Sequence, residues 1–142
     1  MRFWDASAVV PLLVAQRHSR PLQSILATDS SMLVWWTTKI ECVSALARLE
    51  REVSPAPPLS EAFGRLKDFA AGWQEIDPSD EVRDTAARLL RVHPLRTGDA
   101  LQLAAAFVAA GGRPSTLDFV VLDERLATAA QKEGFPIVEI AT

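Results

Sequence analysis

Residues 96–110 read RTGDALQLAAAFVAA, and after Asp99 they are apolar on every side of a helix except at Gln102. A helix that is apolar all round lies in a protein interior, and this one is too short to cross a membrane. Residues 97–99 lie where a helix cap and first turn belong, and two glycines at 111–112 end the helix. The sequence therefore predicts a buried central helix with a carboxylate at its start, where backbone N–H groups favour negative charge.

Length and composition indicate an ordinary globular protein. The 142 residues suit a single domain, 1–142, and contain 49% hydrophobic and 23% charged residues. The net charge of −3 provides no overall basic field, so nucleic-acid binding would need a local group of basic side chains or a metal. Cys42 is the only cysteine and is expected in the core. Because Asp5 interrupts the first apolar segment, we expect no signal peptide, no membrane partner and a cytoplasmic location.

Short apolar segments alternate with helical patterns along the chain. Strands are expected at 2–5, 32–36, 74–76 at a sheet edge, 117–122 and 135–140. Besides the central helix, helices are expected through about residue 14 and over 21–27, 38–52, 59–73, 78–93 and 125–133, with a proline-rich loop at 54–58. Strands alternating with helices predict a three-layer α/β/α domain with a central, mostly parallel sheet flanked by helices.

Four acids are expected at equivalent positions of this fold, at the carboxyl end of a strand or at the start of a helix. Asp5 ends the first strand, Glu41 lies in the first turn after the second, Asp99 opens the central helix and Asp123 ends the penultimate strand. The carboxyl ends of parallel strands form the ligand crevice of such sheets. Carboxylates gathered there repel one another unless a cation lies among them. Because the candidate ligands are all oxygens, the sequence predicts Mg²⁺ or Mn²⁺.

Each of three acids also has a purely structural explanation. Thr38 and Glu41 have the spacing of a capping box, Asp99 could cap the central helix, and Asp123 could start the helix that follows it. Asp5 needs a partner, because it closes a buried strand. Asp118 is a rival for Asp123 but is expected at the opposite end of its strand.

The acidic segments carry a family resemblance. FWDASAVV at the N-terminus, TKIECVSAL near 38–46, HPLRTGDALQLA at 93–104 and FVVLDERLATAA at 119–130 resemble the PIN-domain family, in particular the VapC-type toxins of bacterial toxin–antitoxin pairs. The resemblance spans nearly the whole chain, with the acidic segments in the family's order. It implies a PIN-like fold in which Asp5, Glu41, Asp99 and Asp123 are the metal-binding and catalytic residues.

The resemblance also implies a function. It predicts a Mg²⁺- or Mn²⁺-dependent endoribonuclease, the toxin of a type II toxin–antitoxin system, which hydrolyses RNA phosphodiester bonds by a metal-activated water. A cognate antitoxin protein is the implied partner, and a homodimer is the implied assembly. Apolar side chains of the helices at 38–52 and 59–73 either belong to the core or form a groove for an antitoxin segment.

Further residues are candidates for supporting roles. Ser7 and Thr97 could orient a carboxylate, or could be ordinary turn and cap residues. The basic residues expected near the crevice, which could contact RNA phosphates, are Arg17, Arg20, Lys39, Arg96 and Arg125. His18 and His93 are expected at the surface or at helix ends.

Two other classes of protein stay possible at this stage. One is a catalytically idle PIN-like binding module. The other is a Mg²⁺-binding phospho-receiver domain, which would need adjacent acids after the first strand and a late lysine, whereas Asp5 stands alone. A nucleotide-binding enzyme is disfavoured, because neither glycine-rich phosphate motif occurs.

Overall fold

The computed structural model of the protein describes residues 1–55 and 58–142, so residues 56–57 of the predicted proline-rich loop lie outside the described part. Within it, the helices are α1 (Ala6–Leu13), α2 (Ser19–Thr28), α3 (Thr38–Glu52), α4 (Ser60–Gly72), α5 (Asp80–Val92), α6 (Thr97–Ala109) and α7 (Glu124–Lys132). The strands are β1 (Arg2–Trp4), β2 (Met32–Trp35), β3 (Gln74–Ile76) and β4 (Phe119–Val120), and a 3₁₀ turn covers Pro114–Thr116. Every predicted helix is present.

The sheet has the strand order β3-β2-β1-β4, and each of its three strand pairs is parallel. The carboxyl ends of the strands therefore share one edge of the sheet. The predicted edge strand at 74–76 is confirmed as β3, which pairs with β2 alone among the described strands.

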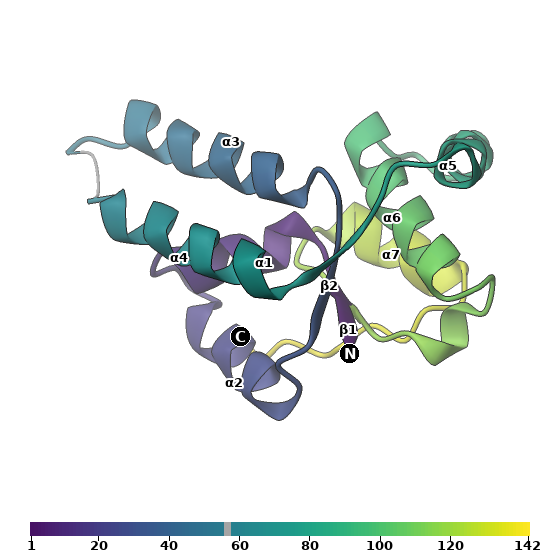
Figure 1. The fold of residues 1–142 in the computed structure, drawn as a ribbon, viewed down its shortest axis with the longest axis horizontal. Helices are drawn as coiled ribbons and strands as arrows, with labels where there is room; N and C mark the ends of the chain where they lie inside the picture. Colours follow the sequence, from purple (N-terminus) through teal and green to yellow (C-terminus); the bar gives the residue numbers. More distant parts are fainter. Residues whose placement is uncertain (56–57) are drawn as a thin grey trace.

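Helices cover both faces of this sheet, which confirms the predicted three-layer α/β/α fold. Figure 1 shows α1 to α4, purple to teal, on one side of the strands and α5 to α7, green to yellow, on the other. Side chains alternate accordingly: Phe3 and Phe119 pack into the core on the α5–α7 side, whereas Trp4 and Val120 pack into the core on the α1–α4 side.

Helix α6 is the buried central helix that its sequence predicts. Its residues Ala100 and 102–106 are all at most 1% exposed and belong mainly to the core beneath α5 and α7. Its single polar residue in that run, Gln102, is buried with them. Burial of its one large apolar side chain in this run, Leu103, contributes roughly 1.5–3 kcal/mol.

The predicted last strand, 135–140, is wrong. The segment forms an isolated parallel bridge between Phe119 and Ile137, with two backbone hydrogen bonds, from Phe119 to Pro136 and from Val138 to Phe119. Pro136 has no N–H, so the pairing cannot extend toward Phe135. The strand expected at 117–122 is correspondingly reduced to β4.

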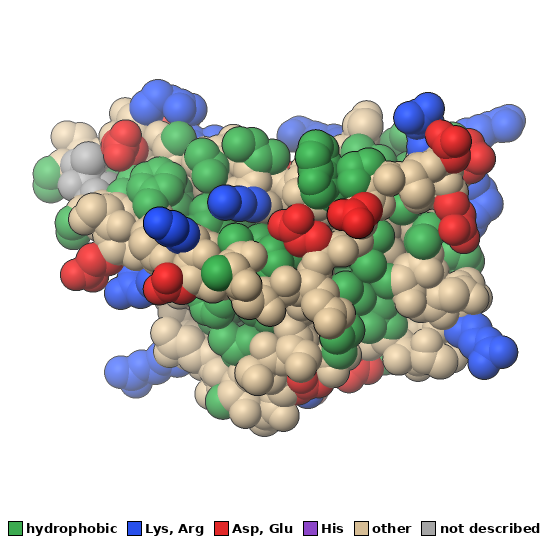
Figure 2. Space-filling model, viewed as in Figure 1, with side chains coloured by type: hydrophobic (Ala, Val, Ile, Leu, Met, Phe, Trp, Pro, Cys, Tyr) green, Lys and Arg blue, Asp and Glu red, His purple; other side chains and the backbone are tan. Residues whose placement is uncertain are grey.

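The surface carries both apolar and charged groups. Figure 2 shows hydrophobic side chains reaching one face of the molecule, with acidic and basic side chains spread around them. Trp36 and Ile40 are the most prominent at the start of α3, 54% and 63% exposed. Cys42 is buried as predicted, and burial raises the pKa of its thiol to about 12. In the described ranges, no helix has the length and apolarity that a membrane span requires.

Candidate active site

Three of the four predicted acids line one cavity of about 650 Å³ at the carboxyl edge of the sheet. Glu41 reaches it from the first turn of α3, Asp99 from the first turn of α6, and Asp123 from the residue before α7. Three arginines and three small residues complete the lining: Arg48, Arg96, Arg125, Ser44, Ala45 and Gly98. The cavity is therefore a charged one, in which carboxylates face guanidinium groups.

Asp5, the fourth acid, is only 4% exposed and lies next to this group. Its Oδ2 accepts hydrogen bonds from the backbone N–H of Ser7 at 3.1 Å and from the Ser7 hydroxyl at 2.5 Å. Burial raises the pKa of Asp5 to about 7, although the bonds from Ser7 oppose this rise. The negative charges of Glu41 and Asp99 raise it further, so these three carboxylates are close enough to repel one another.

Ser7 connects Asp5 to the end of β4. While its hydroxyl donates to Asp5, the same oxygen accepts from the backbone N–H groups of Leu122 at 3.0 Å and Asp123 at 3.2 Å. The expectation that Ser7 orients a carboxylate agrees with this geometry. Thr97 makes no side-chain hydrogen bond in the part of the chain that the structure describes.

Glu41 is held by two side chains, Thr37 at the cap of α3 and Gln102 within α6. Its Oε1 accepts from the Thr37 hydroxyl at 3.2 Å, and its Oε2 accepts from Nε2 of Gln102 at 2.6 Å. Burial raises the pKa of Glu41, the bonds from Gln102 and Thr37 lower it, and the charge of Asp99 raises it again. The capping-box interpretation is wrong: the cap position is Thr37, which makes no side-chain cap bond, and the Thr38 hydroxyl accepts from Gln102 instead.

Asp99 and Asp123 differ in their local roles. Arg96 occupies the cap position of α6, so Asp99 lies inside the first turn and is not the cap. Partial burial raises the pKa of Asp99, Asp123 raises it further, and Arg96 opposes them. Asp123 does cap α7, since its Oδ1 accepts from the N–H of Leu126 at 2.9 Å. Capping therefore accounts for one bond of Asp123 but not for its place in the cavity.

The donor chemistry of this group suits a hard divalent cation. All four acids offer carboxylate oxygens, and the repulsion among them is what a cation would relieve. Among the described residues, no three His, Cys, Asp or Glu side chains are arranged as a ready-made metal site. Mg²⁺ keeps several waters and binds proteins through one or two carboxylates, so an open arrangement fits it better than a closed cage.

The arginines of the cavity are predictable only in part from the sequence. Arg96 and Arg125 line it as expected, whereas Arg17, Arg20 and Lys39 are not among its described lining residues. Arg48 was missed. Helical spacing could have identified it, because residues 41, 44, 45 and 48 recur at the intervals of a single helix face. All four residues line the cavity.

Asp118 lies at the other end of the sheet, as predicted. Its carboxylate is 3.8 Å from Nε of Arg2, the first residue of β1, and its carbonyl accepts from the N–H of Phe3. His93 ends α5, where its Nε2 is 2.7 Å from a carboxylate oxygen of Glu133. Neither residue belongs to the acidic cavity as the structure describes it.

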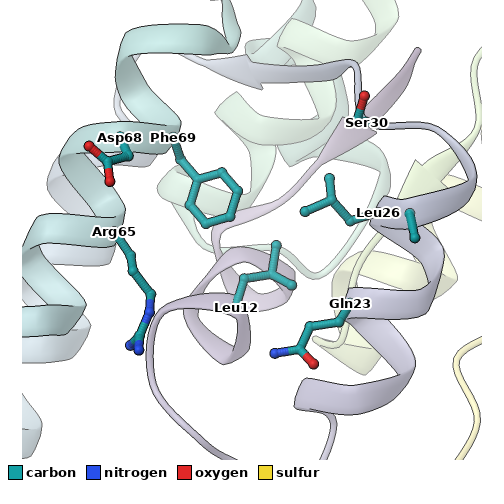
Figure 3. A pocket seen from close by; sticks show the side chains of 8 residues that line it. Leu12, Gln23, Leu26, Ser30, Arg65, Asp68 and Phe69 are labelled. Atoms are coloured by element: carbon teal, nitrogen blue, oxygen red, sulfur yellow. The ribbon is translucent and has the colours of Figure 1, made fainter.

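A second cavity of about 650 Å³, the apolar groove, lies between α1, α2 and α4, away from the acids. In Figure 3, Leu12, Leu26 and Phe69 point toward one another across it, and Gln23, Ser30 and Arg65 stand at its margin. The sequence placed a possible groove on α3 and α4. In the structure α4 lines this groove together with α1 and α2, whereas Cys42 and Leu46 of α3 are buried in the core, the other alternative that the sequence left open.

Comparison with known proteins identifies relatives over nearly the whole chain. No protein-family model matches it. Two curated proteins of Mycobacterium tuberculosis, Ribonuclease VapC45 of strain CDC 1551 / Oshkosh and Ribonuclease VapC49 of strain ATCC 25618 / H37Rv, are each 31% identical to it over 136 residues. Each alignment covers 93% of this chain and 90% of the relative.

Solved structures share the fold at lower identity. A toxin–antitoxin complex from Klebsiella pneumoniae matches with a TM-score of 0.68 at 15% identity, covering 98% of this chain and 97% of the other. FitAcB from Neisseria gonorrhoeae matches at 0.60 and 15% identity with the same coverage. PAE2754 from Pyrobaculum aerophilum matches at 0.60 and 20% identity, covering 96% and 88%. These likenesses establish the architecture.

Proposed function

The chain belongs to the VapC family of ribonucleases, and from this membership we propose that it is a Mg²⁺- or Mn²⁺-dependent endoribonuclease that acts as the toxin of a toxin–antitoxin pair. The observation that carries the proposal is the gathering of Glu41, Asp99 and Asp123 in one cavity, with Asp5 beside them. Because RNA is the proposed substrate, the proposal places the protein in the cytoplasm.

Asp5, Glu41, Asp99 and Asp123 would hold the cation in this proposal. When bound, a divalent cation supplies an activated water and neutralises charge that develops on the scissile phosphate. The protein's own contribution is to orient the carboxylates and, through hydrogen bonds, to oppose the rise in pKa that burial causes at Asp5 and Glu41. Ser7 does this for Asp5, and Thr37 and Gln102 do it for Glu41, through the hydrogen bonds described above.

The arginines of the cavity would attract the RNA backbone. Arg48, Arg96 and Arg125 come from three separate places, α3, the residue before α6 and α7, and all three line the cavity that the acids line. Phosphate contacts from such side chains position a nucleic acid without reading its bases. These arginines are the local group of basic side chains that nucleic-acid binding requires in a protein with a net charge of −3.

We propose that the apolar groove binds the antitoxin. Leu12, Leu26 and Phe69 offer the kind of surface that takes the apolar side of an amphipathic helix, while Arg65 and Asp68 supply charges at its margin. One related fold comes from a structure described as a toxin–antitoxin complex. The groove is separate from the acidic cavity, so partner binding and catalysis can be tested independently.

We also propose a homodimer. The exposed Trp36 and Ile40 provide apolar surface at the start of α3 that a second copy could cover. Sedimentation of the wild type and of Ile40→Lys tests this assembly. A wild type that sediments as a monomer at all concentrations would contradict it.

Cleavage of a mixed single-stranded RNA pool tests the catalytic proposal. Antitoxin-free protein should cut RNA when Mg²⁺ or Mn²⁺ is added, and EDTA should abolish the cutting. Activity that survives EDTA and dialysis would contradict metal dependence. A folded protein that cuts no RNA with any divalent cation, yet binds a protein partner, would instead support the idle binding module.

A further inference from the structure

Gln102 is a polar side chain inside the apolar core helix α6, and it is 1% exposed. A buried amide lowers stability unless its hydrogen-bonding groups are satisfied. Nε2 of Gln102 donates to Oε2 of Glu41 at 2.6 Å and to the Thr38 hydroxyl at 3.0 Å, so each of its two hydrogens has an acceptor. Oε1 is buried and has no hydrogen-bond partner among the described residues.

The partners of Gln102 point to a role beyond core filling. An apolar side chain of the same size would leave no unpaired oxygen in the core, so α6 alone gains nothing from an amide here. The bond to Glu41 joins two helices that come from different parts of the chain, α3 and α6. It is also short, as bonds to a carboxylate are.

Helical geometry relates this bond to Asp99. Asp99 and Gln102 are three residues apart on α6, so they lie on the same side of the helix, one turn apart. Close packing of the same turn is visible at Gly98, where a side-chain carbon would lie 3.7 Å from Oε1 of Glu41. Glu41 is long and flexible, and Gln102 is its hydrogen-bond donor on the helix that carries Asp99.

We propose that Gln102 is a positioning residue that holds the Glu41 carboxylate beside Asp99, so that the two acids can share one divalent cation. This inference rests on the proposed function, because it assigns Glu41 and Asp99 to a cation. Gln102 itself does not touch substrate. It acts from a rigid helix, where a supporting hydrogen bond can set the place of a mobile carboxylate.

Mn²⁺ affinity, measured by calorimetry on RNA-free protein, tests the proposal without reference to activity. Gln102→Leu should weaken Mn²⁺ binding by about 10–100-fold, the usual effect of losing a group that orients a ligand. Thr38→Val is the matched control, because it removes the other bond of the same amide and should change the affinity by less than about threefold. Gln102→Leu removes an unpaired buried oxygen but also leaves the Glu41 carboxylate and the Thr38 hydroxyl without their donor, so it should lower the melting temperature, and the titration is made at a temperature at which the variant is folded.

A double-mutant cycle separates positioning from general damage. In a Glu41→Ala background, Gln102→Leu should cause no additional loss of Mn²⁺ affinity, because its target is gone. An equal loss in both backgrounds would overturn the proposal. So would a Gln102→Leu protein that binds Mn²⁺ as the wild type does, while Glu41→Ala binds it weakly; the proposed function would then stand. A wild type that binds no Mn²⁺ would remove the proposed function and this inference together.

The wild-type protein provides a test that does not depend on folding of a variant. The two side-chain amide protons of Gln102, assigned through their loss in Gln102→Met, should exchange slowly with solvent and shift when Mg²⁺ is added. Two results would contradict the role assigned to Gln102. One is rapid exchange of these protons with solvent; the other is chemical shifts of Gln102 that do not change with Mg²⁺ although the chemical shifts of Glu41 do.

Discussion

The hydroxyl of Ser7 joins Asp5 to the backbone of Asp123. One oxygen donates to the carboxylate that follows β1 and accepts from the N–H groups that follow β4, so the ends of two neighbouring strands are tied at the site. Asp5 cannot turn away without breaking this bridge. The orientation of the most buried acid is thus set by the residue two positions after it.

Ser7→Ala should impair catalysis more than folding. The substitution removes the 2.5 Å bond to Asp5 and the acceptor for two backbone N–H groups. We expect a loss of about 10–100-fold in kcat/KM and about 1–3 kcal/mol in the free energy of unfolding. RNA cleavage and urea denaturation measure the two effects. Ser7→Thr keeps the hydroxyl and should retain more activity than Ser7→Ala; equal loss in both variants would contradict the bridge.

The stability of the metal-free protein should fall as the pH rises toward neutral. The pKa of Asp5 is about 7 in the folded chain against an ordinary value of 3.8, so the folded state binds this proton more tightly than the unfolded state. The stability associated with protonated Asp5 is fully present below about pH 3.8 and is lost as the pH rises through about 7. The raised pKa values of Glu41 and Asp99 act in the same direction.

Mg²⁺ should therefore stabilise the protein more at pH 8 than at pH 5. Protons compete with the cation for the same carboxylates. At a concentration 100-fold above its dissociation constant, the cation should add about 2.7 kcal/mol. Thermal melts with and without Mg²⁺ at both pH values check this. Equal melting-temperature increases at the two pH values would argue against binding at these acids.

Arg48→Ala should weaken RNA binding without changing the fold. Arg48 lines the acidic cavity two helical turns after Glu41 and is exposed. Loss of one phosphate contact should reduce the slope of log affinity against log salt by about one. Arg51→Ala, one turn further along α3, is a matched control, since Arg51 is exposed and absent from the described cavity lining. Binding of a non-cleavable RNA at several salt concentrations distinguishes the two variants, and identical slopes would count against the proposed contact.

Leu26→Glu should separate the two proposed surfaces. It places a charge in the apolar groove and should weaken antitoxin binding by at least about 30-fold, as loss of a central anchor worth about 2 kcal/mol does. RNA cleavage should stay at the wild-type level, because the acids lie elsewhere. The measurement is capture of the co-expressed product of the neighbouring reading frame, with Gln23→Glu at the groove margin as control. Undiminished capture by Leu26→Glu would move the antitoxin site away from the groove.

Sequence patterns predicted the architecture because its main signals are local. The apolar run of α6, the short apolar strands and the acids that follow them are all readable from neighbouring residues. The predicted strand at 135–140 was wrong because pairing depends on a distant partner, Phe119, and Pro136 prevents its extension on one side.

Side-chain contacts across the fold were harder to predict. The spacing of Thr38 and Glu41 in the sequence is that of a capping box. In the fold, Gln102 of α6 instead donates hydrogen bonds to both side chains, and this contact between distant segments cannot be predicted from the spacing. The apolar residues of α3 fit a core or a groove equally well from their spacing, and only the folded chain shows that Cys42 and Leu46 are core whereas Ile40 is exposed. The metal-binding roles of the four acids, and the homodimer, stay predictions.

The most direct test of the account compares Asp99→Asn with Asp118→Asn in RNA cleavage. Both substitutions remove one negative charge from similar side chains, but Asp99 lines the acidic cavity and Asp118 pairs with Arg2 at the opposite end of the sheet. With both proteins folded and Mn²⁺ present, Asp99→Asn should lose at least about 100-fold in rate, about 2.7 kcal/mol of barrier, and Asp118→Asn should cleave like the wild type. Cleavage by Asp99→Asn at the wild-type rate would contradict the assignment of the acidic cavity as the active site.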